Sequence, residues 1–498
     1  MKALRGALVL VLLVVAWCAV LWWLIAPDFA AFGLPELGAI HLAPPLVAWG
    51  GGRFWLGRQR RRRAADAARA DEDAEQGRSA AIEAMRLAHA AERESLHFGC
   101  DCRAVAIVLS DATGSASEIV MPDIDSIHFS ASLPDDSVLE ASLLDHLRPG
   151  IEEALGALYR RCPAALAFPI YLTPPSDVIG EQVIALVKEQ RSRFIVAATE
   201  FVSPEATPGE GDHMVRFLPT ADSAADSAIG LFEAAPELPG MVLLAFDSPW
   251  WRGQLDGQED EASIGDEQGP SAQGVFALVL THPRLTDMLS SRSRSTGSDD
   301  PMTPYWEKGG ANVATPTCLE RLTDRTVDAL SGTEMLVRIH RGVSSITDAG
   351  NARRLELARD LEALIEQAQI NSAQIDLLPS TLEVAELPID SSVVPPSEPK
   401  EYDACGWLVH NSGTFSQGGH RLASLGAALF RRGLDLDLID GATNTCAATG
   451  DLGQARQVAM LALTSAHAAA RQCPALCVEF SNDNRLSAYF VMPQRLQA

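Results

Sequence analysis

The feature that most constrains the fold of this chain is a repeated alternation of short apolar runs with helical patterns. From residue 103 onward, segments follow in the order β-α-β-α-β-α-β-β, and from residue 334 the same order can be followed again. Runs that are apolar on both faces and separated by helices indicate a largely parallel sheet covered on both sides. An order that recurs within one chain predicts a duplicated α/β fold.

The first copy is predicted at residues 99–289 and the second at 333–498, joined by a polar linker at 290–332. In the first copy, strands are expected at 103–110, 164–172, 194–201, 241–247 and 275–280, with helices near 137–161, 176–190 and 220–234. In the second copy, strands are expected at 334–340, 375–378, 436–439, 476–480 and 486–492, with helices near 349–369, 420–432 and 451–471. An extra strand is allowed at 407–410.

The N-terminus carries an apolar segment. Residues 6–26 contain no charge and, at about 1.5 Å per residue, are long enough to cross a bilayer of roughly 30 Å. Trp22 and Trp23 stand where a signal peptide would need small residues for cleavage, so a retained anchor is expected. A weaker apolar stretch at 37–56, interrupted by two prolines and an arginine, is either a second span or a segment lying at the membrane interface.

An arginine cluster, Arg58 with Arg60 to Arg63, follows these segments. Positive residues beside a span stay on the cytoplasmic side. The body is therefore expected in the cytoplasm, held at the inner membrane by residues 1–63, and a periplasmic body is the alternative. Residues 64–98 are rich in Ala, Glu and Arg and predict an exposed helix that spaces the body from the membrane.

The composition excludes several functions. A net charge of −25 argues against nucleic acid as a partner, because phosphate binding needs a concentrated Lys/Arg surface. The nine cysteines form no framework and predict free thiols. Neither the Cys100 and Cys102 pair nor the Cys473 and Cys477 pair has metal-ligand spacing, so no metal or cofactor is expected. The chain also lacks a G-x-S-x-G elbow and an H-E-x-x-H motif, so it is not recognisable as a lipase or zinc protease.

Two segments near the C-terminus carry a resemblance. Residues 448–455 (ATGDLGQA) look like the T-G-H-x-x-G-A-A segment that opens the last helix of β-ketoacyl synthases. Residues 481–484 (SNDN) look like the closing hairpin of those enzymes. With the duplicated element order, the chain resembles the thiolase superfamily. The resemblance implies an α/β fold of two thiolase-like halves with mixed, mainly parallel sheets, behind an N-terminal transmembrane segment.

The chemistry of that superfamily needs a Cys at a helix N-terminus and two imidazoles. The nucleophile is expected before the helix near Thr220, where the sequence holds no cysteine, and Cys162 is the nearest. The first imidazole position is placed at Ser380 and the second at Asp451, which suits a helix N-terminus as a cap. Histidines at element ends, such as His410, are expected to be structural. No catalytic residue is therefore predicted.

A membrane segment, degenerate thiolase-like halves and this C-terminal motif together resemble the type VI lipase adapter family of Gram-negative bacteria. The resemblance implies an adapter that binds a lipase effector and helps to load it onto the spike of a type VI secretion system, with a homodimer as a further expectation. Trp250 and Trp251, in an acidic loop, are candidates for partner binding. The alternatives are a divergent acyl transferase or ketosynthase, and a membrane scaffold for another envelope assembly.

Overall fold

The chain forms two compact units, Met1–Ala90 and Ala91–Ala498, and we call the second unit the body. The structure is a computed structural model, and each unit is described by itself. The residues it describes are 2–25, 33–110, 116–119, 143–173, 175, 179–198, 201, 214–219, 223–247, 273–286, 288–289, 322–347, 353–375, 405–413, 418–481 and 484–494.

Two helices make up the N-terminal unit: α1 (Lys2–Ile25) and α2 (Leu34–Leu96), which continues into the body. Within the described residues, only α1 is apolar and long enough to cross a membrane, over Gly6–Trp23. The weaker apolar stretch forms the first part of α2, which runs for 63 residues through Pro44 and Pro45. The predicted boundary between an anchor and a helical spacer at residue 63 therefore lies inside a continuous helix.

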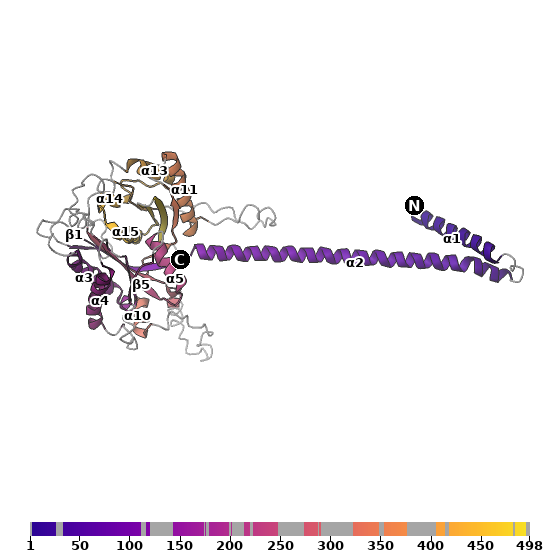
Figure 1. The fold of residues 1–498 in the computed structure, drawn as a ribbon, viewed down its shortest axis with the longest axis horizontal. Coiled ribbons are helices and arrows are strands. Elements are labelled where there is room, and N and C mark those ends of the chain that lie inside the picture. Colours follow the sequence, from indigo (N-terminus) through magenta and orange to yellow (C-terminus); the bar gives the residue numbers. More distant parts are fainter. Residues whose placement is uncertain are drawn as a thin grey trace, which may run out of the picture. The chain divides into compact units, whose positions relative to one another are not determined.

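The body contains two copies of the β-α-β-α-β-α-β-β order (Figure 1). The first copy consists of β1 (Gly99–Ser110), α3 (Leu143–Arg161), β3 (Ile170–Thr173), α4 (Gly180–Ala197), β4 (Val215–Phe217), α5 (Ala224–Ala234), β5 (Gly240–Asp247) and β6 (Gly274–Thr281). The second consists of β7 (Val337–His340), α11 (Arg354–Asn371), β9 (Trp407–His410), α13 (Gly419–Arg431), β10 (Ala442–Asn444), α15 (Arg456–Arg471), β11 (Ala475–Phe480) and β12 (Arg485–Pro493). Smaller elements are β2 (Ala116–Ile119), α10 (Asp324–Gly332), β8 (Val343–Ile346) and α14 (Thr445–Ala448).

The sheet makes the duplication explicit. Its strand order is β10-β9-β11-β12-β7-β1-β6-β5-β3-β4, so each half, followed outward from the β7–β1 junction, repeats one arrangement. In both halves the fifth strand, β6 or β12, is antiparallel to its two main neighbours, and the three outermost strands of each half are parallel to one another. The β7–β1 junction between the halves is antiparallel. This duplicated, mixed arrangement, in which four of the five strands of each half run in the same direction, confirms the predicted thiolase-like α/β fold.

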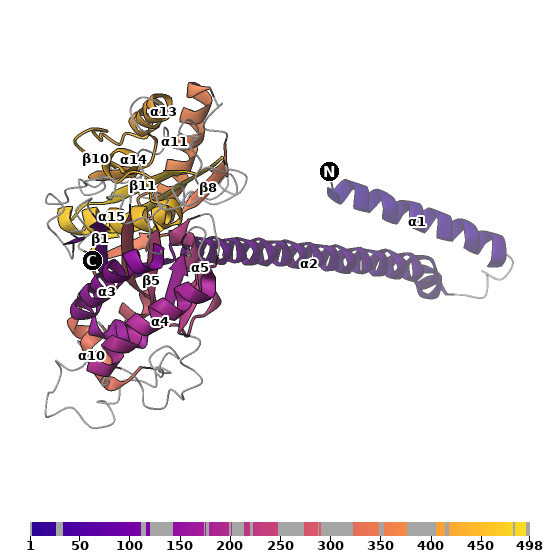
Figure 2. The same cartoon turned by 60° about the vertical axis from the view of Figure 1, so that its left-hand side comes forward.

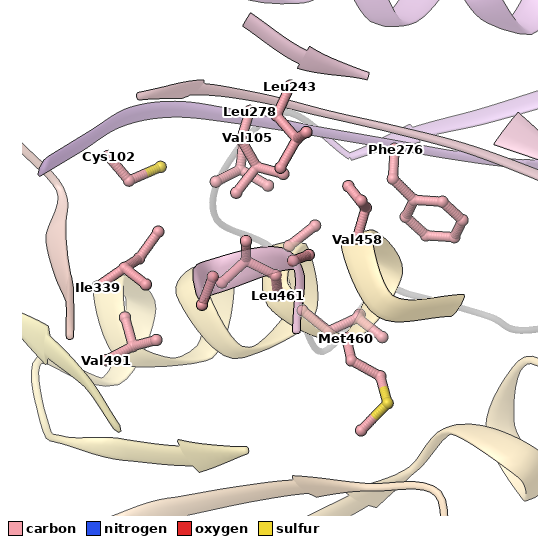
Figure 3. Packing of buried hydrophobic residues seen from close by; sticks show 14 of the residues in the cluster. Cys102, Val105, Leu243, Phe276, Leu278, Ile339, Val458, Met460, Leu461 and Val491 are labelled. Carbon is pink, nitrogen blue, oxygen red and sulfur yellow. The ribbon is translucent and has the colours of Figure 1, made fainter. Parts of the chain in front are cut away.

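Helices cover the strands on both sides and also fill the middle (Figure 2). Helices α3 and α4 pack on the outer face of the first half, and α11 and α13 on the outer face of the second. Helices α5 and α15 lie between the strands of the two halves, in a core that both halves share (Figure 3). Every residue from Val458 to Ala469 is buried, as expected for a helix surrounded by protein.

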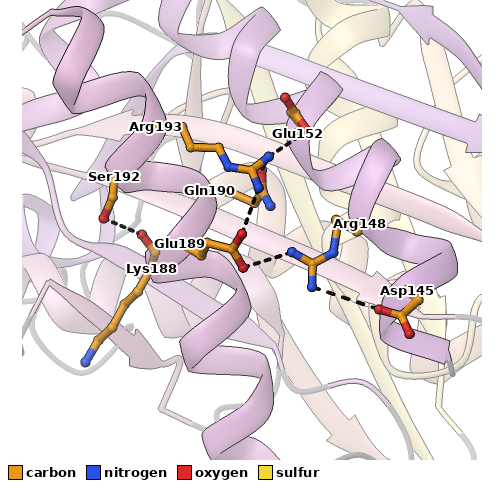
Figure 4. Close-up of polar contacts among 8 residues, drawn as sticks. All are labelled: Asp145, Arg148, Glu152, Lys188, Glu189, Gln190, Ser192 and Arg193. Atoms are coloured by element: carbon orange, nitrogen blue, oxygen red, sulfur yellow. Dashed lines mark hydrogen bonds and ion pairs between the residues drawn. The ribbon is translucent and has the colours of Figure 1, made fainter.

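The outer helices of the first half are also linked by charged side chains (Figure 4). Glu189 of α4 pairs with Arg148 of α3 at 2.9 Å and with Arg193 of its own helix at 2.7 Å. These side chains are between 36% and 52% exposed, so solvent screens the pairs and they contribute little to stability. The apolar contacts beneath them hold the two helices together.

Two strand predictions, at 194–201 and 436–439, are wrong, and a third, at 375–378, lies almost entirely outside the described residues. Residues 194–197 continue α4, because the Phe194 ring packs edge-on against Tyr159 of α3, with 5.3 Å between ring centroids. The third strand of the first half is instead β4, three residues long. In the second half, β9 takes the second position and β10 the third. The segment at 436–439 lies in a turn, and of the strand expected at 375–378 only Ile375 is described, in the turn after α11.

The two halves are joined by carboxylates of the first half and donors of the second. Asp101 of β1 is fully buried and accepts from the Arg338 guanidinium of β7, with an Nε–Oδ1 distance of 2.7 Å. Glu233 at the end of α5 forms an ion pair with Arg341, just after β7. The junction therefore has a fixed polarity, with negative groups on one half and positive groups on the other.

Candidate functional site

The start of α5 is the position at which the superfamily resemblance requires a nucleophilic thiol. Ser223 occupies the N-cap, and its Oγ accepts a hydrogen bond from the backbone N–H of Asp226 at 3.1 Å. The Ser223 hydroxyl donates to Asp226 Oδ2 at 2.6 Å, and Asp226 Oδ1 accepts from the backbone N–H of Gly342 at 2.8 Å. No cysteine occurs in the sequence between Cys162 and Cys318. At this helix start, Ser223 acts as the N-cap and Asp226 accepts hydrogen bonds from Ser223 and Gly342.

The start of α15 is the second position of interest. Asp451 Oδ1 accepts from the backbone N–H of Gly453 at 2.9 Å, at the beginning of the 3₁₀ turn Gly453–Ala455 that leads into the helix. One residue on, the backbone N–H of Gln454 donates at 2.8 Å to Asp247 Oδ2, a fully buried carboxylate at the end of β5. Asp451 therefore contacts the turn before α15, and the helix itself begins after Ala455 without a side-chain cap.

These contacts limit the chemistry of the two helix starts. An acyl-transfer site holds backbone N–H groups ready for the oxyanion that develops during the reaction. Here the backbone N–H groups of Gly342, Gly453 and Gln454 donate to Asp226, Asp451 and Asp247. A bound oxyanion would have to compete with these fixed negative charges for the same donors. The helix starts are thus built to hold carboxylates of the chain itself.

His410 was expected to be structural, and the strand that carries it was assigned differently. The first imidazole of the superfamily is expected after the second strand of the second half. That strand is β9, and His410 is its last residue. Ser380, which was assigned to this position from the sequence, lies outside the described residues. The register of β9 against β11 shows which face the side chain takes: His410 pairs with Val478, which packs in the outer core with α11 and α13. The imidazole is therefore directed away from the middle layer that contains α5 and α15.

The imidazole of His410 is buried and uncharged. Its side chain is fully buried, and burial lowers its pKa to about 4, so the imidazole is neutral at pH 7. Nδ1 faces the backbone N–H of Ser412 at 3.4 Å. Among the described residues, neither His410 Nε2 nor the Ser412 hydroxyl has a hydrogen-bond partner. The sequence signal for this strand was its apolar run W-L-V before a Gly-rich turn and a helix.

The thiols of the middle layer are unsuited to nucleophilic attack. Cys102 of β1 and Cys477 of β11 are buried in the shared core, and burial raises the pKa of each to about 12. The pKa of Cys100 is raised well above its ordinary value, also chiefly by burial. Since the thiolate is the reactive form, these thiols are protonated and inert at neutral pH.

Other candidates from the sequence are not brought together. Trp250 and Trp251 lie outside the described residues. Among the residues that the structure describes, no group of three or more His, Cys, Asp or Glu side chains could hold a metal ion. Sequence reasoning missed Asp226 and Asp247 as residues that tie the halves together, because their partners are backbone groups distant in the chain.

Comparison with known proteins gives structural likenesses alone. No known protein family and no curated protein matches the sequence. Among solved structures, human mitochondrial 3-ketoacyl-CoA thiolase aligns with a TM-score of 0.41 and 9% identity, covering 80% of this chain and 100% of the enzyme. OleA of Xanthomonas campestris aligns at 0.40 and 10% identity, covering 80% of this chain and 99% of OleA. The 3-oxoacyl-[acyl-carrier-protein] synthase III of Aquifex aeolicus VF5 aligns at 0.37 and 10% identity, covering 79% and 100%. No residue role is carried over from them.

Proposed function

We propose that this protein is a non-catalytic adapter, anchored in the inner membrane, that binds a lipase effector and helps to load it onto the spike of a type VI secretion system. One observation supports the non-catalytic part: Asp226, Asp247 and Asp451 accept the backbone N–H groups around the starts of α5 and α15. The lipase and the spike come from the resemblance of the N-terminal segment and of residues 448–455 to the lipase adapter family.

The same observation suggests how the fold is used. Carboxylates that bond across the junction hold the two halves rigid, and a rigid scaffold presents its surface and loops to a partner without reordering. Exposed aromatic side chains often anchor such partners, which keeps Trp250 and Trp251 as the candidates for that contact. The cytoplasmic position of the body belongs to this proposal, and so does the homodimer.

Co-purification tests the adapter. The full-length protein, extracted in mild detergent, is mixed with a phospholipase encoded beside its gene, and the complex is followed by size-exclusion chromatography. We expect the two proteins to elute together, and Trp250→Ala with Trp251→Ala to weaken the complex at least tenfold. Phe430→Ala, at an exposed aromatic residue on α13, is the matched control. Separate elution of the lipase and the wild-type protein would contradict the proposal.

A divergent acyl transferase or ketosynthase is the second candidate, and one observation favours it. Cys446, buried at the start of α14, comes two residues after Asn444 of β10, which pairs in register with His410 of β9, and among the described residues His410 Nε2 is buried without a hydrogen-bond partner. Burial raises the pKa of Cys446, and the guanidinium of Arg456 acts in the opposite direction.

Thioester labelling separates the two candidates. The full-length protein is incubated with a radiolabelled acyl-CoA and examined for a covalent acyl group. The adapter proposal expects none. A stable adduct that is lost in Cys446→Ser and kept in Cys477→Ser would favour the enzyme.

A further inference from the structure

The first part of α2 packs against α1 through two tryptophan side chains. The indole N–H of Trp17 donates to the backbone carbonyl of Ile40 at 2.9 Å. The indole N–H of Trp49 donates to the backbone carbonyl of Gly6 at 3.1 Å. The early residue of α1 thus contacts the later residue of α2, so the two helices run antiparallel as a hairpin.

The bond from Trp17 replaces a backbone hydrogen bond that α2 lacks at Pro44. In a helix, the carbonyl of Ile40 would accept from the N–H of residue 44, but residue 44 is Pro44 and has no N–H. Trp17 supplies the missing donor from the neighbouring helix. Water could satisfy this carbonyl at a surface, whereas in lipid only protein can, so the bond suits a proline-containing helix inside a bilayer.

The contacts also set the two helices at the same depth. Gly6, at one end of the apolar window of α1, lies opposite Trp49, and Trp17, well inside that window, lies opposite Ile40. If α1 crosses a membrane, the segment of α2 from Leu34 onward must lie beside it. The twenty residues 34–53 span about 30 Å as a helix, which matches the hydrocarbon core.

Charge marks one end of this hairpin. The Arg53 guanidinium lies over the Trp49 ring, 4.7 Å from its centroid, and within 4 Å of the position that a Cβ on Gly6 would take. Arg53 is therefore at the end that also holds Lys2 and Arg5, and the cluster from Arg58 to Arg63 follows on α2. At the other end, the carboxylate of Glu36 accepts from the N–H of Gly33 at 3.2 Å.

Apolar side chains cover the outside of both helices. On α1 the exposed ones include Leu8, Leu12 and Val15, each at least 60% exposed. On α2 they include Val47 at 73% and Leu42 at 51%. Both helices thus offer lipid-compatible surface, and together they shield the backbone around the two prolines.

We infer that residues 2–53 enter the bilayer as a two-helix hairpin, with lipid acyl chains as the partner of its apolar surface. The N-terminus and the body then lie on the same, arginine-rich side, and the residues around Gly33 lie on the opposite side. By the positive-inside rule the shared side is cytoplasmic. The inference rests on the proposed membrane insertion and is independent of lipase binding.

Cysteine accessibility in the full-length chain tests the topology. Gly33→Cys and Ala65→Cys, both at exposed positions, are treated with a membrane-impermeant maleimide in intact spheroplasts and again after lysis. Labelled peptides are quantified by mass spectrometry, and the wild-type chain gives the background from its native thiols. We expect Gly33→Cys to be labelled at least tenfold more than Ala65→Cys in intact spheroplasts, and both to be labelled after lysis.

Labelling of Ala65→Cys alone would overturn the cytoplasmic sidedness, and three other outcomes overturn the hairpin itself. Labelling of both positions from outside would mean a single span with an external body. Protection of both in a membrane-bound chain would mean that α1 alone crosses, with both positions inside. A chain recovered in the soluble fraction would remove the anchor as well, while the lipase co-purification would still report on the adapter role.

Discussion

Replacing Asp101 by alanine tests whether charge holds the two halves together. Asp101 is fully buried at the β1–β7 junction and accepts from Arg338 Nε at 2.7 Å and Nη2 at 3.3 Å. It also accepts from the hydroxyl of Thr286, which in turn accepts from Arg103 Nη2 at 3.0 Å. Asp101→Ala therefore leaves a guanidinium and a hydroxyl without their acceptor, at the place where the sheets of the two halves meet.

The expected size follows from burial. Removing one partner of a buried ion pair costs about 3–5 kcal/mol. The side chain of Arg338 is 24% exposed and can turn partly to water, which favours the lower end, about 3 kcal/mol. A cooperative body of roughly 400 residues has an unfolding entropy near 0.8 kcal/mol/K, so Tm should fall by about 4 °C.

Differential scanning calorimetry of the full-length protein measures this shift. Asp145→Ala is the matched control, because that carboxylate is 64% exposed and lies 3.9 Å from Arg148, and its Tm should stay within about 1 °C of wild type. Adding Arg338→Leu to Asp101→Leu should recover part of the loss, since no unpaired charge remains. A wild-type Tm in Asp101→Ala would refute the idea that this pair holds the junction.

Three further predictions concern the core and the hairpin. Burial raises the pKa of Cys102 and Cys477 to about 12, so iodoacetamide at pH 8 should modify them at least roughly a hundredfold more slowly in the folded than in the unfolded chain, as measured by peptide mapping. Burial lowers the pKa of His410 to about 4, so the unfolded state binds more protons than the folded state between about pH 4 and 6.5. The free energy of unfolding should therefore fall as pH falls through that window, by about 1.4 kcal/mol per pH unit. The variant His410→Asn should show a smaller loss of Tm between pH 7 and 5 than the wild type. Trp17→Phe removes the donor to Ile40 and should release more chain from membranes on mild detergent extraction than Trp23→Phe, at an 88% exposed position; equal release would count against the bond.

The duplicated fold was largely readable from the sequence, and its short strands were not. Long runs such as residues 241–247 and 275–280 are apolar on both faces, which only a covered strand explains. The strand β4 has three residues, of which Arg216 and Phe217 are exposed, so it carries little periodic signal. The reverse error arose at Phe194, where β-prone residues stay helical because the ring packs on α3.

The candidate site was partly predictable. The missing cysteine before α5 can be read from the sequence, and a local contact of Asp451 is also accessible to it, because the partner Gly453 is two residues away. The direction of His410 could not be predicted, because it depends on the register of β9 against β11. A shift of one residue in that register would turn the imidazole towards the middle layer.

By itself, the sequence determined the features set by neighbouring residues: the apolar N-terminal helix, the alternation of strands and helices, and the absence of a thiol from the start of α5. Only the tertiary structure decided which distant groups meet. Asp226 contacts Gly342 and Asp247 contacts Gln454, at sequence separations of 116 and 207 residues. The indole of Trp17 donates to the carbonyl of Ile40, whose usual helical donor is missing because residue 44 is a proline. The physical reason is that every residue except proline carries the same backbone N–H and C=O groups. Only the folded chain therefore determines which of these groups a carboxylate or an indole contacts.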